Sequence, residues 1–408
     1  MTAEGPFVTA AGAPVDDTDV LVVGAGPTGL ALGAALALEG RRVVVADREK
    51  RSRATSRAVI VHARTLELLD WLGAADTLIG LGVPVRRITV RDRDQVLMPI
   101  TFDRLPSAHP YALMVPQHVT EAVLADRLAD LGVGVLRPWR VASVTQGDNG
   151  VVARSEDGRA IRAAFAVGCD GRHSTVREAA GIALDGPTYR EGFAVADAKL
   201  SGGVPRNQAV LYLSPEGLLL VAPLPGPLHR IVAAEERRPG AIDRGFVQHL
   251  LDARGPHQDR ARVEHVDWGS YFHIDHGLAA DYHRGRLVVA GDAAHVHSPV
   301  GGQGMNVGIV DAIALAPVLG AILDGGPLTL LDEYDAARRP VADGIATATD
   351  RLTRLAVVDH RLRAVRNLLL STAARVPLIP RRLALRLSGM VYRDTITTDN
   401  TPVGLAAR

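Results

Sequence analysis

The chain has 408 residues, of which 47% are hydrophobic and 22% are charged, and its formal net charge is +1. This length predicts two to three domains of about 150 residues each, with cores large enough to need no covalent staple. The near-zero charge argues against nucleic acid as a partner. The single cysteine, Cys169, argues against a disulfide framework and fits a reducing cytoplasm.

Residues 1–16 carry acidic side chains and lack a continuous apolar run after a basic start, so they predict a flexible extension and not a signal peptide. No stretch approaches about 18 uninterrupted apolar residues, and we therefore expect no transmembrane helix.

The folded sequence opens with a strand–helix–strand pattern. An apolar run from Asp19 to Gly24 predicts a buried parallel strand. The alanine- and leucine-rich stretch from Pro27 to Glu39 predicts a helix that Gly40 ends. A second buried strand is expected from Arg42 to Asp47.

The middle of the chain alternates between helical and extended patterns. Helices are expected over 64–72 and 118–131, and antiparallel strands over 141–168. Between about 190 and 275, short apolar segments separated by glycine- and proline-rich turns predict a separate antiparallel sheet. Residues 286–291 return to the pattern of a buried strand.

Helical sequence dominates from Met305 to the end, with breaks near Gly325-Gly326 and between Pro377 and Pro380. The basic residues of about the last 60 positions are interpreted as a solvated helix face. A membrane-surface role is the alternative interpretation.

The first motif with a chemical meaning follows the first strand: Gly24, Gly26, Pro27, Thr28 and Gly29. Glycines at these positions permit a tight turn and the close approach of a pyrophosphate, and the helix N-terminus offers free N–H groups to the phosphates. Asp47, which ends the next strand, suits a carboxylate that binds an adenosine ribose. The pattern predicts dinucleotide binding without separating FAD from NAD.

Two further motifs follow predicted strands. The second is Cys169-Asp170-Gly171-Arg172, which by itself is more typical of an ordinary turn than of a binding site. The third runs from Gly291-Asp292 through Pro299 to the loop of Gly301, Gly302 and Gly304, which opens a helix and suits an anion. His295 and His297 lack a clear third ligand, so no metal site is predicted.

The three motifs, in this order and spacing, resemble those of the FAD-dependent aromatic hydroxylases, the flavoprotein monooxygenases typified by para-hydroxybenzoate hydroxylase. The residues of the third motif resemble those of actinobacterial enzymes that tailor polyketides and other secondary metabolites, including antibiotics. Many such enzymes carry a thioredoxin-like C-terminal domain, whereas this chain has arginine-rich helices there.

The resemblance implies a set of cofactor-binding residues. The glycine motif and Asp47 would hold the pyrophosphate and ribose of FAD, with Arg48 beside them. Arg57 matches a flavin-contacting arginine, and Gln117 a glutamine near the ribityl and phosphate groups. Asp170 matches an acid tied to FAD and to the nicotinamide cofactor, and Asp292 one that binds the ribityl chain. The loop from Pro299 through Gly302, Gly304, Met305 and Asn306 would lie against the isoalloxazine.

The resemblance also implies a reaction. NAD(P)H would reduce FAD, O2 would add to give a flavin C4a-hydroperoxide, and its terminal oxygen would pass to an electron-rich carbon of an aromatic or polyketide-like substrate. Backbone N–H groups of Gly304, Met305 and Asn306 at the helix start are suited to stabilise negative charge on the reduced flavin.

The substrate side is less determined by the sequence. A base or proton path would help a phenol to react. Tyr212, Tyr271 and His273 are candidates, although each is more readily interpreted as packing or surface than as catalytic, and the carbonyl of Pro299 is a candidate substrate contact. The apolar residues from Leu218 to Leu224 are expected either to cover the substrate or to form sheet core.

The predicted fold class is α/β with α+β elements. A Rossmann-like FAD-binding domain is expected from residues 17–80, 105–185 and 281–345, an antiparallel-sheet substrate domain from 81–104 and 186–280, and C-terminal helices over 346–408. The protein is expected to be a cytoplasmic monomer or homodimer without integral membrane contact. Baeyer–Villiger oxidation, epoxidation and prenyl-lipid-type flavin reduction remain alternatives, as does a non-catalytic flavin-binding protein.

Overall fold

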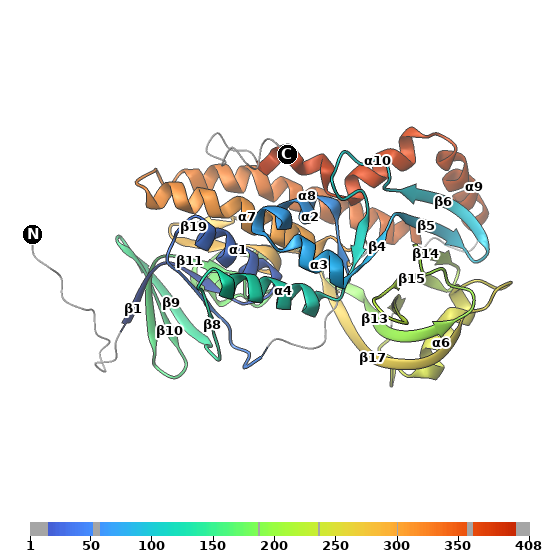
Figure 1. Cartoon of the computed structure of the whole chain (residues 1–408), viewed down its shortest axis with the longest axis horizontal. Helices are drawn as coiled ribbons and strands as arrows, with labels where there is room; N and C mark the ends of the chain where they lie inside the picture. Colours follow the sequence, from blue (N-terminus) through green and yellow to red (C-terminus); the bar gives the residue numbers. More distant parts are fainter. Residues whose placement is uncertain are drawn as a thin grey trace, which may run out of the picture.

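The computed structural model describes residues 15–51, 58–186, 188–235, 237–299, 301–356 and 362–396. It has a nucleotide-binding half at one end and a broad antiparallel sheet at the other, with long helices running between them (Figure 1). The predicted fold class is confirmed.

The nucleotide-binding half is built on an eight-stranded sheet. Five strands are parallel in the order β20-β11-β1-β2-β8, with bounds Leu287–Val289, Ala160–Gly168, Val15–Val23, Val43–Ala46 and Val135–Leu136. An edge strand β19 (His283–Arg284) and the hairpin β9 (Val141–Gly147) and β10 (Gly150–Ser155) add antiparallel strands. Residues 141–168 therefore form the expected antiparallel strands, but the last of them, β11, also joins the parallel sheet.

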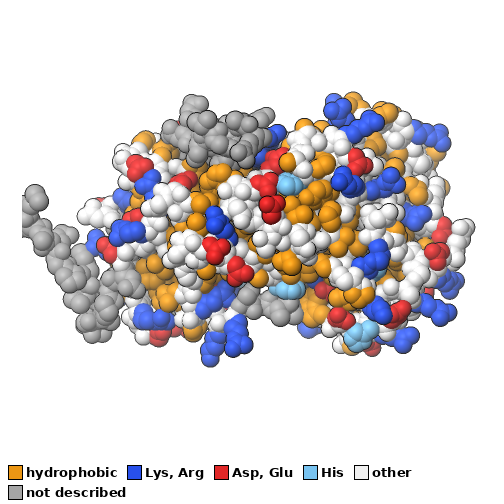
Figure 2. Space-filling model, in the orientation of Figure 1, with side chains coloured by type: hydrophobic (Ala, Val, Ile, Leu, Met, Phe, Trp, Pro, Cys, Tyr) orange, Lys and Arg blue, Asp and Glu red, His pale blue; other side chains and the backbone are white. Residues whose placement is uncertain are grey.

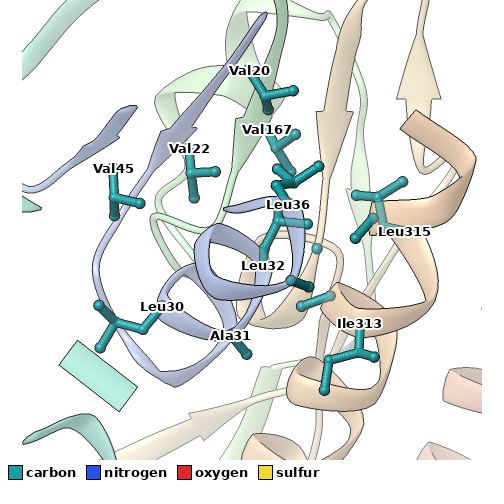
Figure 3. Close-up of a cluster of buried hydrophobic side chains, with 14 of the residues drawn as sticks. Val20, Val22, Leu30, Ala31, Leu32, Leu36, Val45, Val167, Ile313 and Leu315 are labelled. Carbon is teal, nitrogen blue, oxygen red and sulfur yellow. The ribbon is translucent and has the colours of Figure 1, made fainter. Parts of the chain in front are cut away.

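Two apolar helices, α1 (Pro27–Leu38) and α7 (Gly304–Leu323), pack on each other and on this sheet. Figure 3 shows Leu32 and Leu36 of α1 between strand residues such as Val20 and the α7 residues Ile313 and Leu315. These side chains are at most 1% exposed, so their burial supplies much of the driving force for this half. Among the described residues, α7 alone is long and apolar enough to cross a membrane, but 89% of its most apolar window is buried within the protein.

The second large sheet has seven strands in the order β17-β13-β16-β15-β14-β5-β6. Their bounds are Arg262–Asp275, Thr188–Ser201, Leu228–Glu235, Gly217–Pro223, Ala209–Ser214, Arg87–Asp92 and Gln95–Thr101. All neighbours are antiparallel except β14 and β5. Helix α6 (Arg244–Arg254) covers one face.

The other face of this sheet, called the inner face from here on, turns toward the nucleotide-binding half. Its apolar side chains join one cluster with a small sheet of β3 (Ile60–Val61), β7 (Ala112–Met114) and β4 (Val83–Val85), and with helices α9 (Arg363–Ala374) and α10 (Leu378–Leu387). The cluster thus joins segments from widely separated parts of the chain.

The remaining elements connect these layers. They are α2 (Ala63–Leu72), α3 (Ala75–Leu81), α4 (Gln117–Asp130), α5 (Thr175–Ala179), η1 (Gly291–Ala293), α8 (Leu330–Ala356) and η3 (Met390–Ile396), and the three-stranded sheet of β12 (Leu184–Asp185), β18 (Gly277–Ala279) and β21 (His295–Val296). Helix α8 runs unbroken across residue 345, where the sequence suggested a boundary between domains. Val341 and Ile345 lie on its buried side, and its exposed side is polar, so α8 is a single amphipathic helix.

Candidate active site

The three glycine-containing motifs meet at one edge of the nucleotide-binding sheet, where its parallel strands end. The Cys169 N–H donates to the carbonyl of Val23 over 2.7 Å, and the Ala290 N–H donates to the carbonyl of Gly168 over 3.0 Å. A Cβ placed on Gly24 would lie 2.3 Å from the Cys169 carbonyl oxygen, so only glycine fits there. In open parallel sheets, this edge is where ligands bind.

The start of α1 has the form of a pyrophosphate site. No side chain caps the helix at Gly26, which leaves its first N–H groups available, and a Cβ on Gly26 would meet no atom within 4 Å. Pro27 occupies the first turn, where its missing N–H costs nothing. Thr28 instead points into the protein against Gly291, where a Cβ would lie 2.5 Å from its hydroxyl oxygen. The first and third motifs are therefore in direct contact.

Asp47 lies beside this helix start. Its carboxylate accepts hydrogen bonds from the N–H groups of Ala25 at 2.7 Å and Glu49 at 2.8 Å. The first bond ties the end of β2 to the glycine turn. Arg48 is exposed and lies 3.7 Å from the Glu49 carboxylate. Asp47 is thereby held next to the uncapped start of α1, and Arg48 follows it in the chain.

Asp170 also lies at this edge of the sheet, next to Gly24. Its carboxylate accepts the Thr175 N–H at 2.7 Å, which caps α5, and its backbone packs against Gly24. Burial raises the pKa of Asp170 above its ordinary value, although hydrogen bonds from Ser174 and Thr175 oppose the shift. The Asp-Gly element is thus both a helix cap and part of the glycine turn.

The glycine-rich loop before α7 is held by side-chain hydrogen bonds. Asn306 is buried and donates to the carbonyls of Ile60 (2.8 Å) and Gly302 (2.7 Å), and it accepts the His62 N–H at 2.8 Å. The His62 ring bonds the Gly301 carbonyl at 2.9 Å. Burial lowers the pKa of His62 to about 4, so the ring is neutral. The side chain of Asn306 therefore faces the protein, and its backbone is what remains to meet a cofactor.

The start of α7 again lacks a side-chain cap, so the N–H groups of Gly304, Met305 and Asn306 suit an anionic group. Gly302 adopts a φ of +63° and lies against Ile60, a member of the inner-face cluster. The Gly302 N–H donates to the carbonyl of Pro299 at 2.9 Å. This loop is where the two halves of the molecule meet.

Asp292 and Gln117 lie in segments outside the loop. Asp292 is exposed in η1, directly after β20. Gln117 opens α4, and its side-chain oxygen accepts the Ala58 N–H at 3.4 Å. Arg57 lies outside the described residues. Ala58, which follows it, also accepts a hydrogen bond from Arg230 of β16 at 2.9 Å.

One buried ionic network was not predicted. Asp311, fully buried in α7, accepts hydrogen bonds from Arg338 of α8 at 2.6 Å and from His295 at 2.7 Å. Burial alone would raise the pKa of Asp311, but Arg338 and His295 outweigh it and hold that pKa below its ordinary value. The sequence feature that could have indicated this network is Asp311 itself, a single acidic residue within an otherwise apolar helical stretch. Among the described residues, no group of three or more His, Cys, Asp or Glu side chains is arranged to hold a metal ion.

The inner face offers an apolar surface next to the glycine-rich loop. Phe193 and Phe272 stack there with ring centroids 6.3 Å apart, and Leu213 and Leu218 belong to the same cluster. The segment 218–224 divides between the two faces, because Leu219 and Val221 pack under α6. A buried ion pair between two of these strands joins Arg230, which is 1% exposed, to Asp197 through two 2.7 Å contacts.

The three candidate bases lie on the side of the sheet opposite the inner face. Tyr212 is buried among the side chains under α6. Tyr271 pairs in register with Ala194 and donates to the Glu235 carbonyl at 3.2 Å, and His273 packs edge-on against it. Their neighbour Phe272 takes the inner-face position, because side chains alternate along a strand.

Comparison with known proteins finds a matching family model and several similar proteins. The model of a family described as "FAD binding domain" matches residues 17–349. A 12-dehydrotetracycline 5-monooxygenase/anhydrotetracycline 6-monooxygenase from Streptomyces rimosus is 34% identical over 95% of this chain and 79% of its own length. A 6-methylpretetramide 4-monooxygenase from Streptomyces rimosus is 37% identical over 86% of this chain, which spans 64% of that relative. The solved structure of an anhydrotetracycline hydroxylase from the same species has a TM-score of 0.75 at 33% identity and covers 91% of this chain and 76% of its own.

Proposed function

This chain belongs to the FAD-binding-domain family of aromatic hydroxylases and is an FAD-dependent monooxygenase that uses NAD(P)H and O2, and we propose that it hydroxylates a flat, largely apolar aromatic or polyketide-like molecule. We also propose that it works in the cytoplasm as a monomer or homodimer.

The observation that carries the substrate proposal is the character of the inner face. Its side chains next to the glycine-rich loop are aliphatic or aromatic, led by the stacked Phe193 and Phe272. The Arg230 guanidinium there is already matched by the Asp197 carboxylate. A small anionic substrate such as a hydroxybenzoate would need an unmatched cation, whereas a polycyclic ring system needs extended apolar contact. The relatives named for tetracycline precursors act on molecules of that second kind.

The cofactor, when bound, accepts hydride from NAD(P)H and activates O2. The proposed tasks of the protein are to bind, orient and exclude water. The amides at the start of α1 would hold the pyrophosphate, and Asp47 and Arg48 would lie at the adenosine end. Asp292, Gln117 and Arg57 would bind toward the flavin, and the amides of Gly304 to Asn306 would stabilise negative charge beside its ring. The carbonyl of Pro299 would face the substrate.

The test is to incubate the purified, flavin-loaded protein with NADPH and a panel of phenols. Anhydrotetracycline and related polycyclic phenols represent the proposed class, and para-hydroxybenzoate is the small anionic comparison. We expect the polycyclic compounds to accelerate NADPH oxidation and to give a product heavier by one oxygen atom. Ring expansion or an epoxide would favour the Baeyer–Villiger or epoxidising alternatives. Reduction of the substrate without oxygen incorporation, or a preference for para-hydroxybenzoate, would overturn the proposal.

A further inference from the structure

Helix α9 presents its apolar side chains to solvent. Leu368 is 66% exposed, Leu369 64%, Leu362 56% and Val365 54%, and the spacing of these residues places them along one side of the helix. The stripe continues past the helix end through Val376 (48%) and Leu378 (51%). We call these six residues the aliphatic stripe. Scattered exposed leucines need no explanation, but a contiguous set of this kind marks an interaction surface.

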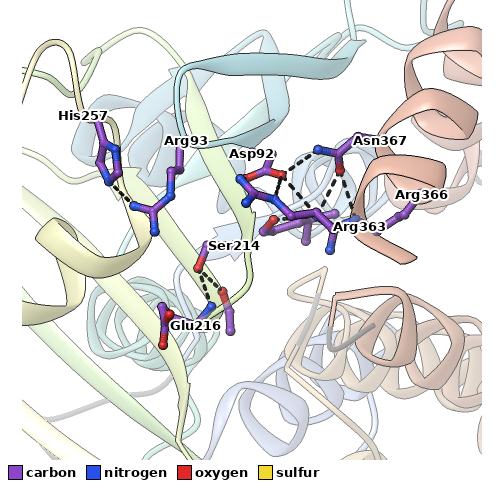
Figure 4. Close-up of polar contacts among 10 residues, drawn as sticks. Asp92, Arg93, Ser214, Glu216, His257, Arg363, Arg366 and Asn367 are labelled. Atoms are coloured by element: carbon purple, nitrogen blue, oxygen red, sulfur yellow. Dashed lines mark hydrogen bonds and ion pairs between the residues drawn. The ribbon is translucent and has the colours of Figure 1, made fainter. Parts of the chain in front are cut away.

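The orientation of α9 is fixed by polar contacts on its other side. Arg363 binds the buried carboxylate of Asp92 through contacts of 2.6 and 2.7 Å, and Asn367 donates to the same carboxylate at 2.6 Å. Arg366 donates to the Leu213 carbonyl at 2.8 Å. Figure 4 shows these side chains converging on Asp92 from one side of the helix. An amphipathic helix normally turns its polar side outward, whereas the inward side of α9 carries these polar residues together with Leu370.

The segment that carries the stripe has charge of one sign. Residues 362–393 contain no aspartate or glutamate. Arg375, Arg381, Arg382 and Arg386 of this segment are exposed. In the orientation of Figure 1, basic and hydrophobic side chains lie side by side over α9 and α10 at the upper right of Figure 2. The surface is therefore suited to an occupant that is both apolar and anionic.

We propose that the aliphatic stripe and its flanking arginines dock on the surface of an anionic lipid bilayer. Leucine and valine side chains would enter the boundary between headgroups and acyl chains, while the arginines would lie at the level of the lipid phosphates. A second copy of this chain fits less well, because a symmetric pairing of the same patch would bring arginines of both copies together without carboxylates between them.

The docked face lies close to the proposed substrate position. The inward side chains of α9 and α10, including Leu370 and Leu383, pack on the inner-face cluster. The Leu387 carbonyl of α10 accepts a 2.9 Å hydrogen bond from Gln303 of the glycine-rich loop. Docking would therefore bring an apolar substrate dissolved in the bilayer within one layer of helices of the inner face. This last step rests on the proposed function, whereas bilayer docking itself does not.

The experiment uses the full-length, flavin-loaded protein and vesicles of phosphatidylcholine, with or without about one third phosphatidylglycerol, in a co-sedimentation assay. We expect binding to the anionic vesicles at low salt and its loss at high salt, because surface attraction is screened. The double variant Leu368→Glu/Leu369→Glu should lower the partition coefficient by about tenfold or more. Leu328→Glu is the matched control, since Leu328 is 40% exposed but lies just before α8. Flavin content and thermal unfolding of both variants check that they fold.

Three outcomes would overturn the proposal. The wild-type protein fails to sediment with anionic vesicles, or binds both vesicle types equally. The Leu328→Glu control loses binding as strongly as the double variant. Light scattering shows a dimer that the double variant abolishes, while vesicle binding is absent, which would assign the stripe to a second copy. None of these results depends on whether a substrate is turned over, so a failure here is distinguishable from a failure of the proposed function.

Discussion

The cofactor-binding edge and the inner face of the seven-stranded sheet touch at Gly302 and Ile60, yet the first presents mainly backbone groups and the second mainly side chains. The backbone groups of the edge are those of the uncapped helix starts and of glycines whose positions leave no room for a side chain. The carboxylates of Asp47 and Asp170 hold its turns in place through hydrogen bonds to backbone N–H groups. The inner face consists of side chains whose position depends on which way each strand residue points. We therefore expect few substitutions to be tolerated at the cofactor-binding edge, whereas side chains of the inner face can be substituted one at a time.

The largest expected effect comes from the two glycines that flank the start of α1. A Cβ on Gly29 would lie 1.9 Å from the Gly24 carbonyl oxygen, so Gly29→Ala should prevent folding of the nucleotide-binding half. A Cβ on Gly26 meets no protein atom within 4 Å, so Gly26→Ala should fold but lose FAD. Circular dichroism and flavin absorbance separate the two results. Full flavin content in Gly26→Ala would contradict the assignment of the pyrophosphate site.

Removing the charge of Asp311 should have the next largest effect. Asp311→Asn leaves Arg338 without its charged partner in a fully buried position, which should lower the free energy of unfolding by about 3–5 kcal/mol. The control is Asp324→Asn, since Asp324 is 64% exposed in its ion pair with Arg41 and should cost less than about 1 kcal/mol. Urea denaturation measures both, and equal losses would show that burial is not what makes the network matter.

A smaller effect is expected on the inner face. Phe272→Leu keeps an apolar side chain but removes the aromatic stack with Phe193, so KM for a polycyclic substrate should rise about tenfold with little change in flavin content. Tyr271→Phe removes a hydroxyl from the other face of the same strand and should leave KM unchanged. If Tyr271→Phe changed KM and Phe272→Leu did not, the assignment of the two faces would be reversed.

The effect expected to be smallest at neutral pH comes from two buried histidines, and it grows as the pH falls. Burial lowers the pKa values of both His62, in the cofactor loop, and His229, in the sheet, to about 4 from an ordinary 6.5. At a pH between about 4 and 6.5, both imidazoles are protonated in the unfolded chain but neutral in the folded chain. Because protons then bind preferentially to the unfolded chain, the free energy of unfolding should fall as the pH drops from about 6.5 toward 4. Each histidine contributes at most about 1.4 kcal/mol per pH unit. His62→Gln and His229→Gln should each flatten the slope, but only His62→Gln should reduce flavin retention; an unchanged slope would show that these rings ionise freely.

The part of the fold that could be predicted is the part fixed by short motifs. The strand ending at Gly24, the helix opening at Pro27 and the helix opening after Gly302 all follow from local sequence, because turn geometry and helix starts depend on neighbouring residues. The contact of Thr28 with Gly291 and the bond between Asp311 and Arg338 could not be predicted, because they join segments whose separation in space no local pattern encodes.

The face of the sheet on which the three candidate bases lie could not be predicted for a related reason. Alternation along β17 is broken by an extra residue, Asp267, where the register with β13 shifts. Val266 therefore packs under α6 while Trp268, two residues later, joins the inner face. Without the partner strand the bulge is invisible, and every inward or outward assignment after it has no fixed starting point.

That bulge accommodates one extra residue of strand length. Val266 and Trp268 pair with the neighbouring β13 residues Ala198 and Asp197, so deleting Asp267 would make them consecutive and leave Tyr271, Phe272 and His273 on the faces that they now occupy. A change in length by one residue can therefore arise at this point among homologues without altering which side chains reach the inner face.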